Sequence, residues 1–283
     1  MEKGILYLCA TPIGNLEDIS VRTLNTLKQV DLIACEDTRH SLKLLNHFDI
    51  SKPLTSYHEH NKAEKGEILI EKLLSGVNIA LVSDAGTPAI SDPGEDLVKR
   101  CIEADIRVIP IPGPAALINA LIVSGQNTGR FTFEGFLSMN RRSRNEHLNS
   151  LKDETRTMIF YEAPHKLTRT IDDMLSVFGN RDITFVKELT KIHETVFKTN
   201  LCDAVSYFEQ NPPKGEYVLV IAGKPELEIK QEAEKEFEDM TVTEHVDSII
   251  KTGVDKKEAI KQVAKLRNLP KRDVYNIYCG NEE

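Results

Sequence analysis

The chain has 283 residues, of which 40% are hydrophobic and 28% charged, and its formal net charge is −8. This length allows a sizeable core divided between two or more domains. The acidic balance excludes a general nucleic-acid coat protein but leaves room for local basic patches.

The five cysteines are scattered and odd in number, and no Cys-x-x-Cys or His/Cys cluster accompanies them. This pattern predicts a reducing compartment and no structural zinc. The first residues lead directly into an expected strand, which is not typical of a signal peptide. No apolar run approaches the roughly 18 residues of a membrane helix. We therefore expect a soluble cytoplasmic protein without a metal.

The first half of the chain alternates short apolar runs with amphipathic helical patterns. Such alternation predicts a parallel sheet with right-handed crossovers. The expected strands lie at residues 5–10, 30–35, 54–57, 78–82 and 106–110.

The loop at residues 83–95, SDAGTPAISDPGE, follows one of these strands and precedes a helical pattern. It is longer than most strand-to-helix connections, which have about 2–6 residues. Gly86 and Gly94 permit positive φ, Pro88 and Pro93 fix φ, and the small side chains let a ligand approach the backbone. Because ligands bind at the carboxyl ends of parallel strands, the loop is either part of a ligand crevice or a tightly capped connection.

Two further loops end at the same predicted edge. Residues 11–18, TPIGNLED, lack the G-x-G-x-x-G and Walker patterns and so do not predict a phosphate cradle. Residues 111–116, IPGPAA, are again rich in glycine, proline and small side chains. Three such loops are consistent with one ligand crevice.

Adjacent charges follow the second expected strand in Glu36-Asp37-Thr38-Arg39-His40. Either Asp37 or Thr38 caps the next helix while Arg39 neutralises the carboxylates, or Asp37 and Arg39 belong to a functional site. His58 and His60 allow a metal site, but no third ligand is obvious nearby, so we favour a polar loop.

Residues 124–129, SGQNTG, are the best linker to a second α/β region. Its expected strands are shorter and alternate in polarity, which indicates a mixed sheet. Between the first two of them, residues 140–144 form a basic loop in which Ser143 is a candidate helix N-cap.

The C-terminal part changes character. Residues 225–239 are acidic, which indicates a solvated connector. Three short helices are expected to follow, with N-caps at Thr243 and Asp255 and with Pro270 at the first helical position of the third. The part that contains these three helices is rich in lysine and arginine. Such a stretch is typical of a helix-turn-helix module that contacts nucleic acid, or else of a lysine-rich solvated face.

Eight stretches in order carry a family resemblance: TPIGNLEDIS, CEDTRH, SDAGTPAISDPG, PIPGPAA, EGF, IFYEAPH, KELTKIHE and GEYVLVIAG. Together they resemble the bacterial small-subunit ribosomal RNA cytidine 2′-O-ribose methyltransferases, which are class III S-adenosylmethionine-dependent enzymes of the tetrapyrrole methylase superfamily. The resemblance covers residues 5 to about 225 and extends to the C-terminal module.

The resemblance implies an α/β, two-domain tetrapyrrole-methylase fold with a parallel N-terminal sheet, a mixed C-terminal sheet and a small C-terminal helical module. The expected limits are residues 1–124, 125–225, 226–239 (linker) and 240–283. It also implies a homodimer, S-adenosylmethionine between the α/β domains, and a cytidine in the decoding region of the small ribosomal subunit as substrate. The residues expected to line the cofactor pocket are Asp84, Ala85, Gly86, Thr87, Pro88, Ala115, Ala116 and Glu162.

Methyl transfer to a ribose hydroxyl is an in-line displacement, in which positioning and a general base both help. Asp37 and Glu188 are the first candidates for the general base, and His193 is the third. Arg39 and Lys191 are expected to hold phosphates or lower the hydroxyl pKa, and Asn15 to orient the ribose. RNA contacts are expected from local basic side chains: Arg141, Arg142, Arg144, Lys261, Lys265, Lys271 and Arg272.

Two alternatives stay open. A tetrapyrrole C-methyltransferase would usually carry a G-G-D-P type loop at residues 84–87 and methionine in place of Glu162, and this chain has neither. A non-catalytic RNA-binding assembly factor would share the basic patches but need no cofactor loops.

Overall fold

The computed structural model describes residues 2–229, 231–232 and 240–280. Two compact units divide the chain, Met1–Ala222 and Gly223–Glu283. Much of the expected acidic connector lies outside the described residues.

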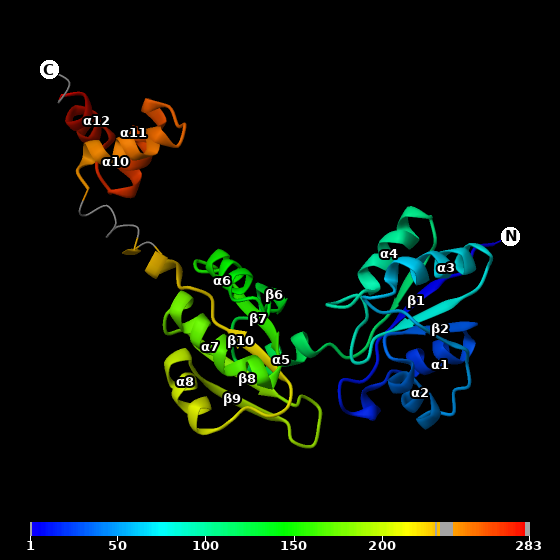
Figure 1. The fold of residues 1–283 in the computed structure, drawn as a ribbon. Helices are drawn as coiled ribbons and strands as arrows, with labels where there is room; N and C mark the ends of the chain where they lie inside the picture. Colours follow the sequence, from blue (N-terminus) through cyan, green and yellow to red (C-terminus); the bar gives the residue numbers. More distant parts are fainter. Residues whose placement is uncertain (1, 230, 233–239, 281–283) are drawn as a thin grey trace. The chain divides into compact units, whose positions relative to one another are not determined.

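The first unit begins with a five-stranded parallel sheet (Figure 1). Its strands are β1 (Leu6–Cys9), β2 (Leu32–Cys35), β3 (Leu54–Ser56), β4 (Ile79–Val82) and β5 (Val108–Ile111), in the order β3-β2-β4-β1-β5. Each pair is parallel, as the alternating pattern predicts.

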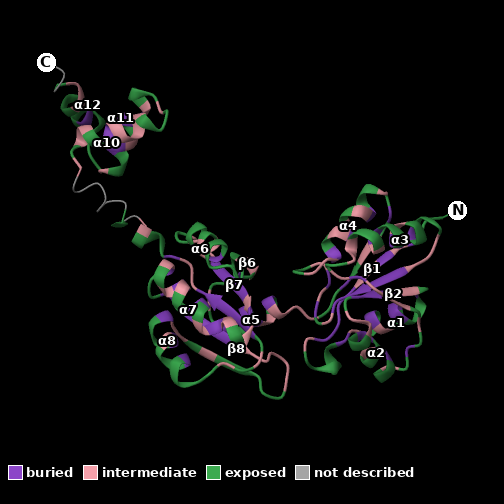
Figure 2. Ribbon diagram, viewed as in Figure 1, coloured by how far each residue is buried: buried purple, intermediate pink, exposed green. Residues whose placement is uncertain are grey.

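Helices cover both faces of this sheet, which is why its strands are nearly continuous apolar runs (Figure 2). One face packs against α3 (Lys62–Leu74) and α4 (Gly94–Glu103) through Leu69, Leu73 and Leu97. The other packs against α1 (Val21–Gln29) and α2 (Thr38–His47) through Leu27 and Leu45. A short 3-10 helix, η1 (Leu16–Asp18), precedes α1.

A second five-stranded sheet follows in the same unit. Its strands are β6 (Phe131–Phe136), β7 (Thr157–Glu162), β8 (Asp182–Lys187), β9 (Thr195–Asn200) and β10 (Tyr217–Ile221), in the order β6-β7-β10-β8-β9. Only β6 and β7 are parallel, so the predicted mixed sheet is confirmed.

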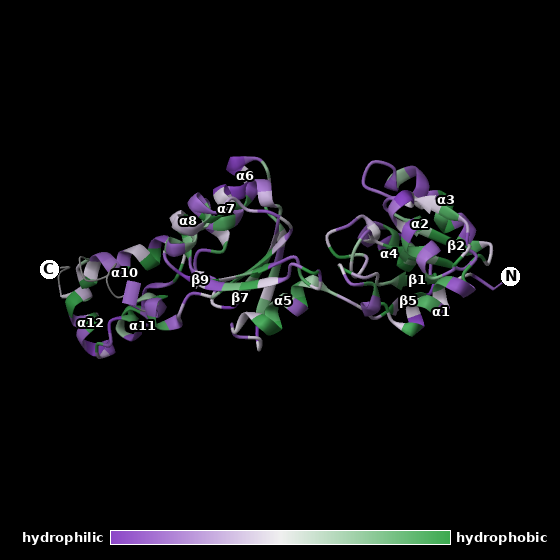
Figure 3. Cartoon of the chain, turned by 90° about the horizontal axis from the view of Figure 1, so that it is seen from below, coloured by the Kyte–Doolittle hydropathy of each residue, from purple (hydrophilic) through white to green (hydrophobic). Residues whose placement is uncertain are grey.

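The second sheet is also covered on both faces. Helices α6 (Arg141–Ser150), α7 (Pro164–Phe178) and α8 (Leu201–Gln210) enclose the larger core, which contains Phe160 and Phe185. Helix α5 (Ala116–Ser124) follows β5 in the chain but packs on the other face of the second sheet. Figure 3 shows hydrophobic residues concentrated on the strands and hydrophilic ones on the outer helices.

Several helix caps differ from the sequence predictions. Ser20 caps α1, and of the two candidates for α2 it is Asp37, not Thr38, that caps the helix. The Ser143 prediction is wrong: Asn140 caps α6 because its side chain reaches the backbone N–H groups of residues 142 and 143.

The second unit contains α10 (Val242–Lys251), α11 (Lys256–Leu266) and α12 (Lys271–Cys279), packed around an apolar core that includes Val246, Ile260 and Val274. Asp255 caps α11 as predicted. The Thr243 prediction is wrong, because Thr241 forms a reciprocal capping box with Glu244. Pro270 occupies the N-cap position itself, one residue earlier than expected. Within the described part of the chain, no helix combines the length and apolarity needed to cross a membrane.

Candidate functional site

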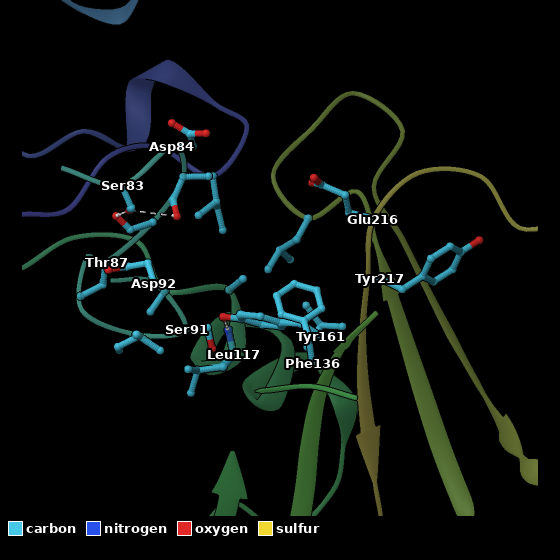
Figure 4. A pocket seen from close by; sticks show the side chains of 18 of the residues that line it. Ser83, Asp84, Thr87, Ser91, Asp92, Leu117, Phe136, Tyr161, Glu216 and Tyr217 are labelled. Atoms are coloured by element: carbon cyan, nitrogen blue, oxygen red, sulfur yellow. Dashed lines mark hydrogen bonds between the residues drawn. The ribbon is translucent and has the colours of Figure 1, made fainter. Parts of the chain in front are cut away.

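A pocket of about 340 Å³ lies in the first unit, where the strand ends of both sheets contribute to its wall (Figure 4). This volume is in the range of small-molecule sites, about 300–1,000 Å³. The first sheet supplies the loops after β1, β2, β4 and β5. The second supplies the ends of β6, β7 and β8 and the start of β10.

The loop after β4 is held in shape by its own hydrogen bonds. Gly86 has φ +85° and exchanges two backbone hydrogen bonds with Thr11, at 2.9 and 3.1 Å. The Thr87 hydroxyl donates to the Pro114 carbonyl at 2.9 Å, which ties this loop to the one after β5. The Asp92 carboxylate accepts the Ala89 and Gly94 N–H groups. The backbone that faces the pocket is therefore fixed before any ligand arrives.

Aromatic and carboxylate side chains from the second sheet form the opposite wall. The Tyr161 hydroxyl accepts the Leu117 N–H at 3.1 Å, and the rings of Phe133 and Phe136 pack edge-on against it. Glu162 is buried, and its carboxylate accepts the Ala163 N–H and, at 2.6 Å, the Thr170 hydroxyl. Phe160, the residue before Tyr161, is a core residue.

The pocket wall is acidic. Partial desolvation, and then the carboxylates of Asp84 and Asp92, raises the pKa of Glu36. Burial raises the pKa of Asp92, against the lowering effect of its backbone hydrogen bonds. Glu216 stands on the second-sheet side of the same pocket (Figure 4). Such a wall suits a cation better than a phosphate.

Seven of the eight residues expected to line the cofactor pocket do line this one, and Pro88 is buried without lining it. Sequence reasoning missed the start of β10, because only the antiparallel pairing places it beside the end of β7. The lining residues not foreseen are Ile13, Glu36, Ser83, Ile90, Ser91, Asp92, Leu117, Phe136, Tyr161, Ala163, Val186, Leu189, Glu216, Tyr217 and Val218.

The first pair of predicted catalytic residues, Asp37 and Arg39, lies next to the pocket lining but not in it. The Asp37 carboxylate accepts the Arg39 N–H and both the Nε and Nη2 of its guanidinium, at 2.8 to 3.2 Å. These bonds lower the pKa of Asp37 to about 2. Its backbone N–H donates to Asp84 Oδ1 at 3.1 Å, which links the loops after β2 and β4.

The second group, Glu188, Lys191 and Asn15, also borders the pocket. Glu188 Oε1 accepts the Glu216 N–H at 2.8 Å and Lys191 Nζ at 3.1 Å, and these two bonds, the backbone one first, lower its pKa. The Asn15 N–H donates to the Thr190 hydroxyl at 3.1 Å, while the Asn15 side chain caps η1. The structure thus brings Asn15 to the 188–191 loop, and places Asp37 with Arg39 as a separate pair.

The predicted RNA-contacting residues divide by exposure. Six are exposed: Arg141, Arg142, Lys261, Lys265, Lys271 and Arg272. Arg144 is only 3% exposed and pairs with Asp173 at 2.7 Å, so it cannot present its side chain on the surface as we expected. His58 and His60 lie in a loop, and among the described residues no three His, Cys, Asp or Glu side chains group as metal ligands.

Comparison with known proteins agrees with this architecture. Residues 5–205 match the family of tetrapyrrole (corrin/porphyrin) methylases. The fold resembles uroporphyrin-III C-methyltransferase from Thermus thermophilus, with a TM-score of 0.56 and 17% identity over 78% of this chain and 94% of that one. It also resembles diphthine synthase, with a TM-score of 0.60 and 14% identity over 78% and 90% of the two chains.

The chain therefore belongs to the tetrapyrrole methylase family. Within it, the sequence is similar to the protein named ribosomal RNA small subunit methyltransferase I in Halalkalibacterium halodurans, with 51% identity over 98% of this chain and 95% of that protein. The proteins of the same name in Synechocystis and Bacillus subtilis share 50% and 46% identity, over 97% and 98% of this chain and 97% and 94% of theirs.

Proposed function

We propose that the chain is an S-adenosylmethionine-dependent methyltransferase that methylates the 2′-hydroxyl of a cytidine ribose in the decoding region of small-subunit ribosomal RNA. It would act in the cytoplasm, on ribosomal subunits. The observation that carries the proposal is the near full-length similarity to proteins named as small-subunit rRNA methyltransferases. The pocket formed by the strand ends of both sheets, within the family's matched region, is its structural support.

The pocket residues fit S-adenosylmethionine. Apolar side chains such as Ile13, Leu117 and Val218 offer a slot for the adenine, and the fixed backbone of residues 84–87 offers donors and acceptors. The carboxylates of Asp84, Glu36 and Glu216 complement a sulfonium and an ammonium group. When bound, the cofactor supplies an electrophilic methyl group on sulfur.

The protein's own contribution is to position the ribose and accept its proton. We propose Asn15, Asp37, Arg39, Glu188 and Lys191 as the surrounding machinery, with the two cations facing the RNA. As proton acceptors, both Asp37 and Glu188 are weakened by their lowered pKa values. Glu36 joins them as a third candidate, because it lines the pocket and partial desolvation raises its pKa above the ordinary value.

The RNA would be held by exposed cations on α6 and on the C-terminal helices, since the chain as a whole is acidic. Truncation after Gly223 should weaken RNA binding more than cofactor binding. Equal RNA affinity for the truncated chain would remove the helical module from the RNA-binding surface.

A homodimer is part of the proposal. Helix α5 packs one face on the second sheet and exposes Ile118 and Ile122 on another, at 42% and 65%. A second copy of the chain would bury this apolar face. Ile122→Glu should shift the species seen by light scattering from dimer to monomer, and an unchanged mass would exclude this face.

The function itself is tested with tritiated S-adenosylmethionine and two substrates in parallel, small ribosomal subunits that lack the modification and a tetrapyrrole precursor. We expect label in 2′-O-methylcytidine after digestion of the RNA. Label in the tetrapyrrole alone would assign the enzyme to the C-methylases. No label, together with no cofactor-dependent rise in melting temperature, would favour a non-catalytic assembly factor.

Once activity is established, Glu36→Gln, Asp37→Asn and Glu188→Gln separate the proton acceptors. The true base should lose about 10²–10⁴-fold in kcat. Cofactor affinity should change little in Asp37→Asn and Glu188→Gln, which lie outside the pocket lining, whereas Glu36→Gln should also weaken cofactor binding because it removes a carboxylate of the pocket wall. If all three retain full turnover, none of the three is the base.

A further inference from the structure

A second, smaller cavity of about 70 Å³ lies wholly within the α6–α7 side of the second sheet. Four of its lining residues can be cationic, and none of the eight described lining residues is acidic: Leu137, Ser138, Met139, Arg144, His165, Lys166, Arg169 and Thr170. We refer to these eight residues as the basic cavity.

Arg144 is the unusual member of the basic cavity. Its Nε donates to Asp173 at 2.7 Å, and its Nη1 donates to the Ser138 and Met139 carbonyls at 3.0 and 3.3 Å. Its Nη2 is buried and has no hydrogen-bond partner. A buried donor without a partner is destabilising, and more so when the group is charged. Asp173 already uses the neighbouring nitrogen, so the guanidinium still has capacity for one more anionic oxygen.

Helix α7 brings the other cations to the same place. His165, Lys166 and Arg169 stand in its first two turns, at spacings that share one side of a helix. The positive end of the helix dipole points the same way, and Ala163 at the N-cap position offers no capping side chain. The helix dipole, the side chains of Lys166 and Arg169, and the buried Arg144 guanidinium therefore converge at the cavity. Two carboxylates, Asp173 and Glu162, neighbour them.

The basic cavity adjoins the wall of the larger pocket. Thr170 lines the cavity and donates to Glu162, which lines the pocket. Lys166 also links the two: its Nζ lies 4.0 Å from Glu162 Oε1 and 5.9 Å from the centroid of the Phe136 ring. An anion in the cavity would thus sit one side-chain layer from a methyl donor in the pocket.

We infer that the basic cavity binds a phosphodiester of the RNA substrate and so fixes the strand beside the methylation site. This inference rests on the proposed function. Arg144 supplies a rigid donor and does not reach out to the strand, while Lys166 and Arg169 close over the phosphate from the exposed side. The free phosphate ion has the same chemistry, and the experiment separates the two.

The test compares wild type with Arg169→Gln, Arg169→Lys and the control Arg107→Gln. Arg107 is exposed before β5 and outside both cavities, so its variant matches the loss of charge. In the first measurement, inorganic phosphate is titrated into each protein and the NMR signal of the ¹⁵N-labelled Arg144 Nε–H group reports binding. The second is the affinity for unmodified small ribosomal subunits at several salt concentrations, alongside the affinity for S-adenosylmethionine.

We expect phosphate to shift the Arg144 signal in wild type and Arg107→Gln, and much less in Arg169→Gln. Arg169→Gln should lose about tenfold in subunit affinity and reduce the salt slope by about one, as expected for one lost phosphate contact. Arg169→Lys should recover most of the affinity, and cofactor affinity should be the same in all four proteins.

Three outcomes would overturn the inference, each at a different point. An unmoved Arg144 signal with unchanged salt slopes removes the anion site altogether. A moved signal with unchanged subunit affinity leaves a free-anion site that RNA does not use. A moved signal in a wild-type protein that neither binds nor methylates subunits retains the anion site and rejects the proposed function.

Discussion

The two sheets of the first unit build the same pocket by different means. In the first sheet every strand is parallel, so the loops after β1, β2, β4 and β5 meet at one edge by geometry alone. In the second sheet the pocket takes the ends of β7 and β8 but the start of β10, because β10 runs antiparallel between them. The pocket loops of the parallel sheet can therefore be predicted from the order of strands along the chain. Those of the mixed sheet can be predicted only once the pairing of its strands is known.

The difference extends to how each half is stabilised. The pocket loops of the first sheet are held by backbone hydrogen bonds and positive-φ residues such as Gly86. The second sheet relies on side chains, among them Tyr161, Glu162 and the Arg144–Asp173 pair beneath its helices. Substitutions should therefore act on the backbone in one half and on buried polar pairs in the other.

The largest effect is expected from Arg144→Met. It leaves Asp173, whose side chain is 15% exposed, without its cation. Breaking a buried pair from one side costs roughly 3–5 kcal/mol, which should lower the melting temperature by about 10 °C. Thermal unfolding followed by circular dichroism measures the change.

Arg142→Met is the matched control on the same helix, since Arg142 pairs with Glu146 with side chains 87% and 63% exposed. Its cost should stay near 0.3–0.5 kcal/mol, roughly that of an exposed helical pair. The double variant Arg144→Met/Asp173→Leu should recover most of the lost stability. Equal melting temperatures for Arg144→Met and Arg142→Met would show that the buried pair does not stabilise the fold more than an exposed one.

Next in size is a comparison of two glycines that both have positive φ. Gly86, at φ +85°, lies in the pocket loop with an added Cβ 3.2 Å from the Ile13 side chain, whereas Gly179, at φ +72°, ends α7 with nothing within 4 Å. Alanine at Gly86 should cost about 1–2 kcal/mol of backbone strain. Gly179 has ψ −166°, in a region that is essentially confined to glycine, so alanine there should cost about 1–3 kcal/mol. Only Gly86→Ala should also weaken S-adenosylmethionine binding, by about tenfold.

Isothermal titration with the cofactor measures this difference directly. If Gly179→Ala weakened cofactor binding as much as Gly86→Ala, general destabilisation would explain both. Unchanged binding in Gly86→Ala would mean that the loop backbone is not part of the cofactor site.

Much of the fold follows from the sequence. Apolar runs such as residues 79–82 are local signals, and this run forms β4 as predicted. Cap positions were less certain, because Asn140 and Ser143, or Thr241 and Thr243, have equivalent chemistry and only the backbone geometry distinguishes them.

Site residues could be predicted where the signal lies in their own stretch of sequence. The loop at residues 84–87 carries its signal in its own glycine and small side chains. Tyr217 and Val218 carry no such signal, because they resemble ordinary strand residues in the sequence. Only strand pairing sets Tyr217 between Glu162 and Lys187, and Val218 between Tyr161 and Val186. For Arg144 the sequence signal is local but misleading. A run of basic residues predicts exposed side chains, whereas the ion pair with Asp173 of α7 buries the Arg144 side chain.

A smaller effect is expected from Tyr161→Phe, which removes the acceptor of the Leu117 N–H. The loss should be about 1 kcal/mol of stability, with cofactor affinity reduced a few-fold because both residues line the pocket. Tyr57→Phe is the control, since it removes a 3.3 Å hydrogen bond to Asp96 in the first sheet's core and leaves this pocket untouched. A cofactor affinity equal to wild type in Tyr161→Phe would place the hydroxyl outside the working part of the wall.

The smallest effect is expected from the pH dependence of stability that Asp37 confers on the first sheet's half. Hydrogen bonds from Arg39 lower the pKa of Asp37 to about 2, against roughly 3.9 for an unfolded aspartate. The folded state therefore binds its proton less tightly, and the pair stabilises the protein fully above about pH 5 and loses this contribution as the pH falls from about 4 to about 2. Because asparagine also caps a helix, Asp37→Asn removes the charge and keeps the cap. The difference in melting temperature between wild type and Asp37→Asn should be constant from pH 8 to 5 and shrink below pH 4. A difference that instead disappeared around pH 6 would mean that Asp37 titrates near neutrality, and would make it a better proton acceptor than its contacts with Arg39 allow.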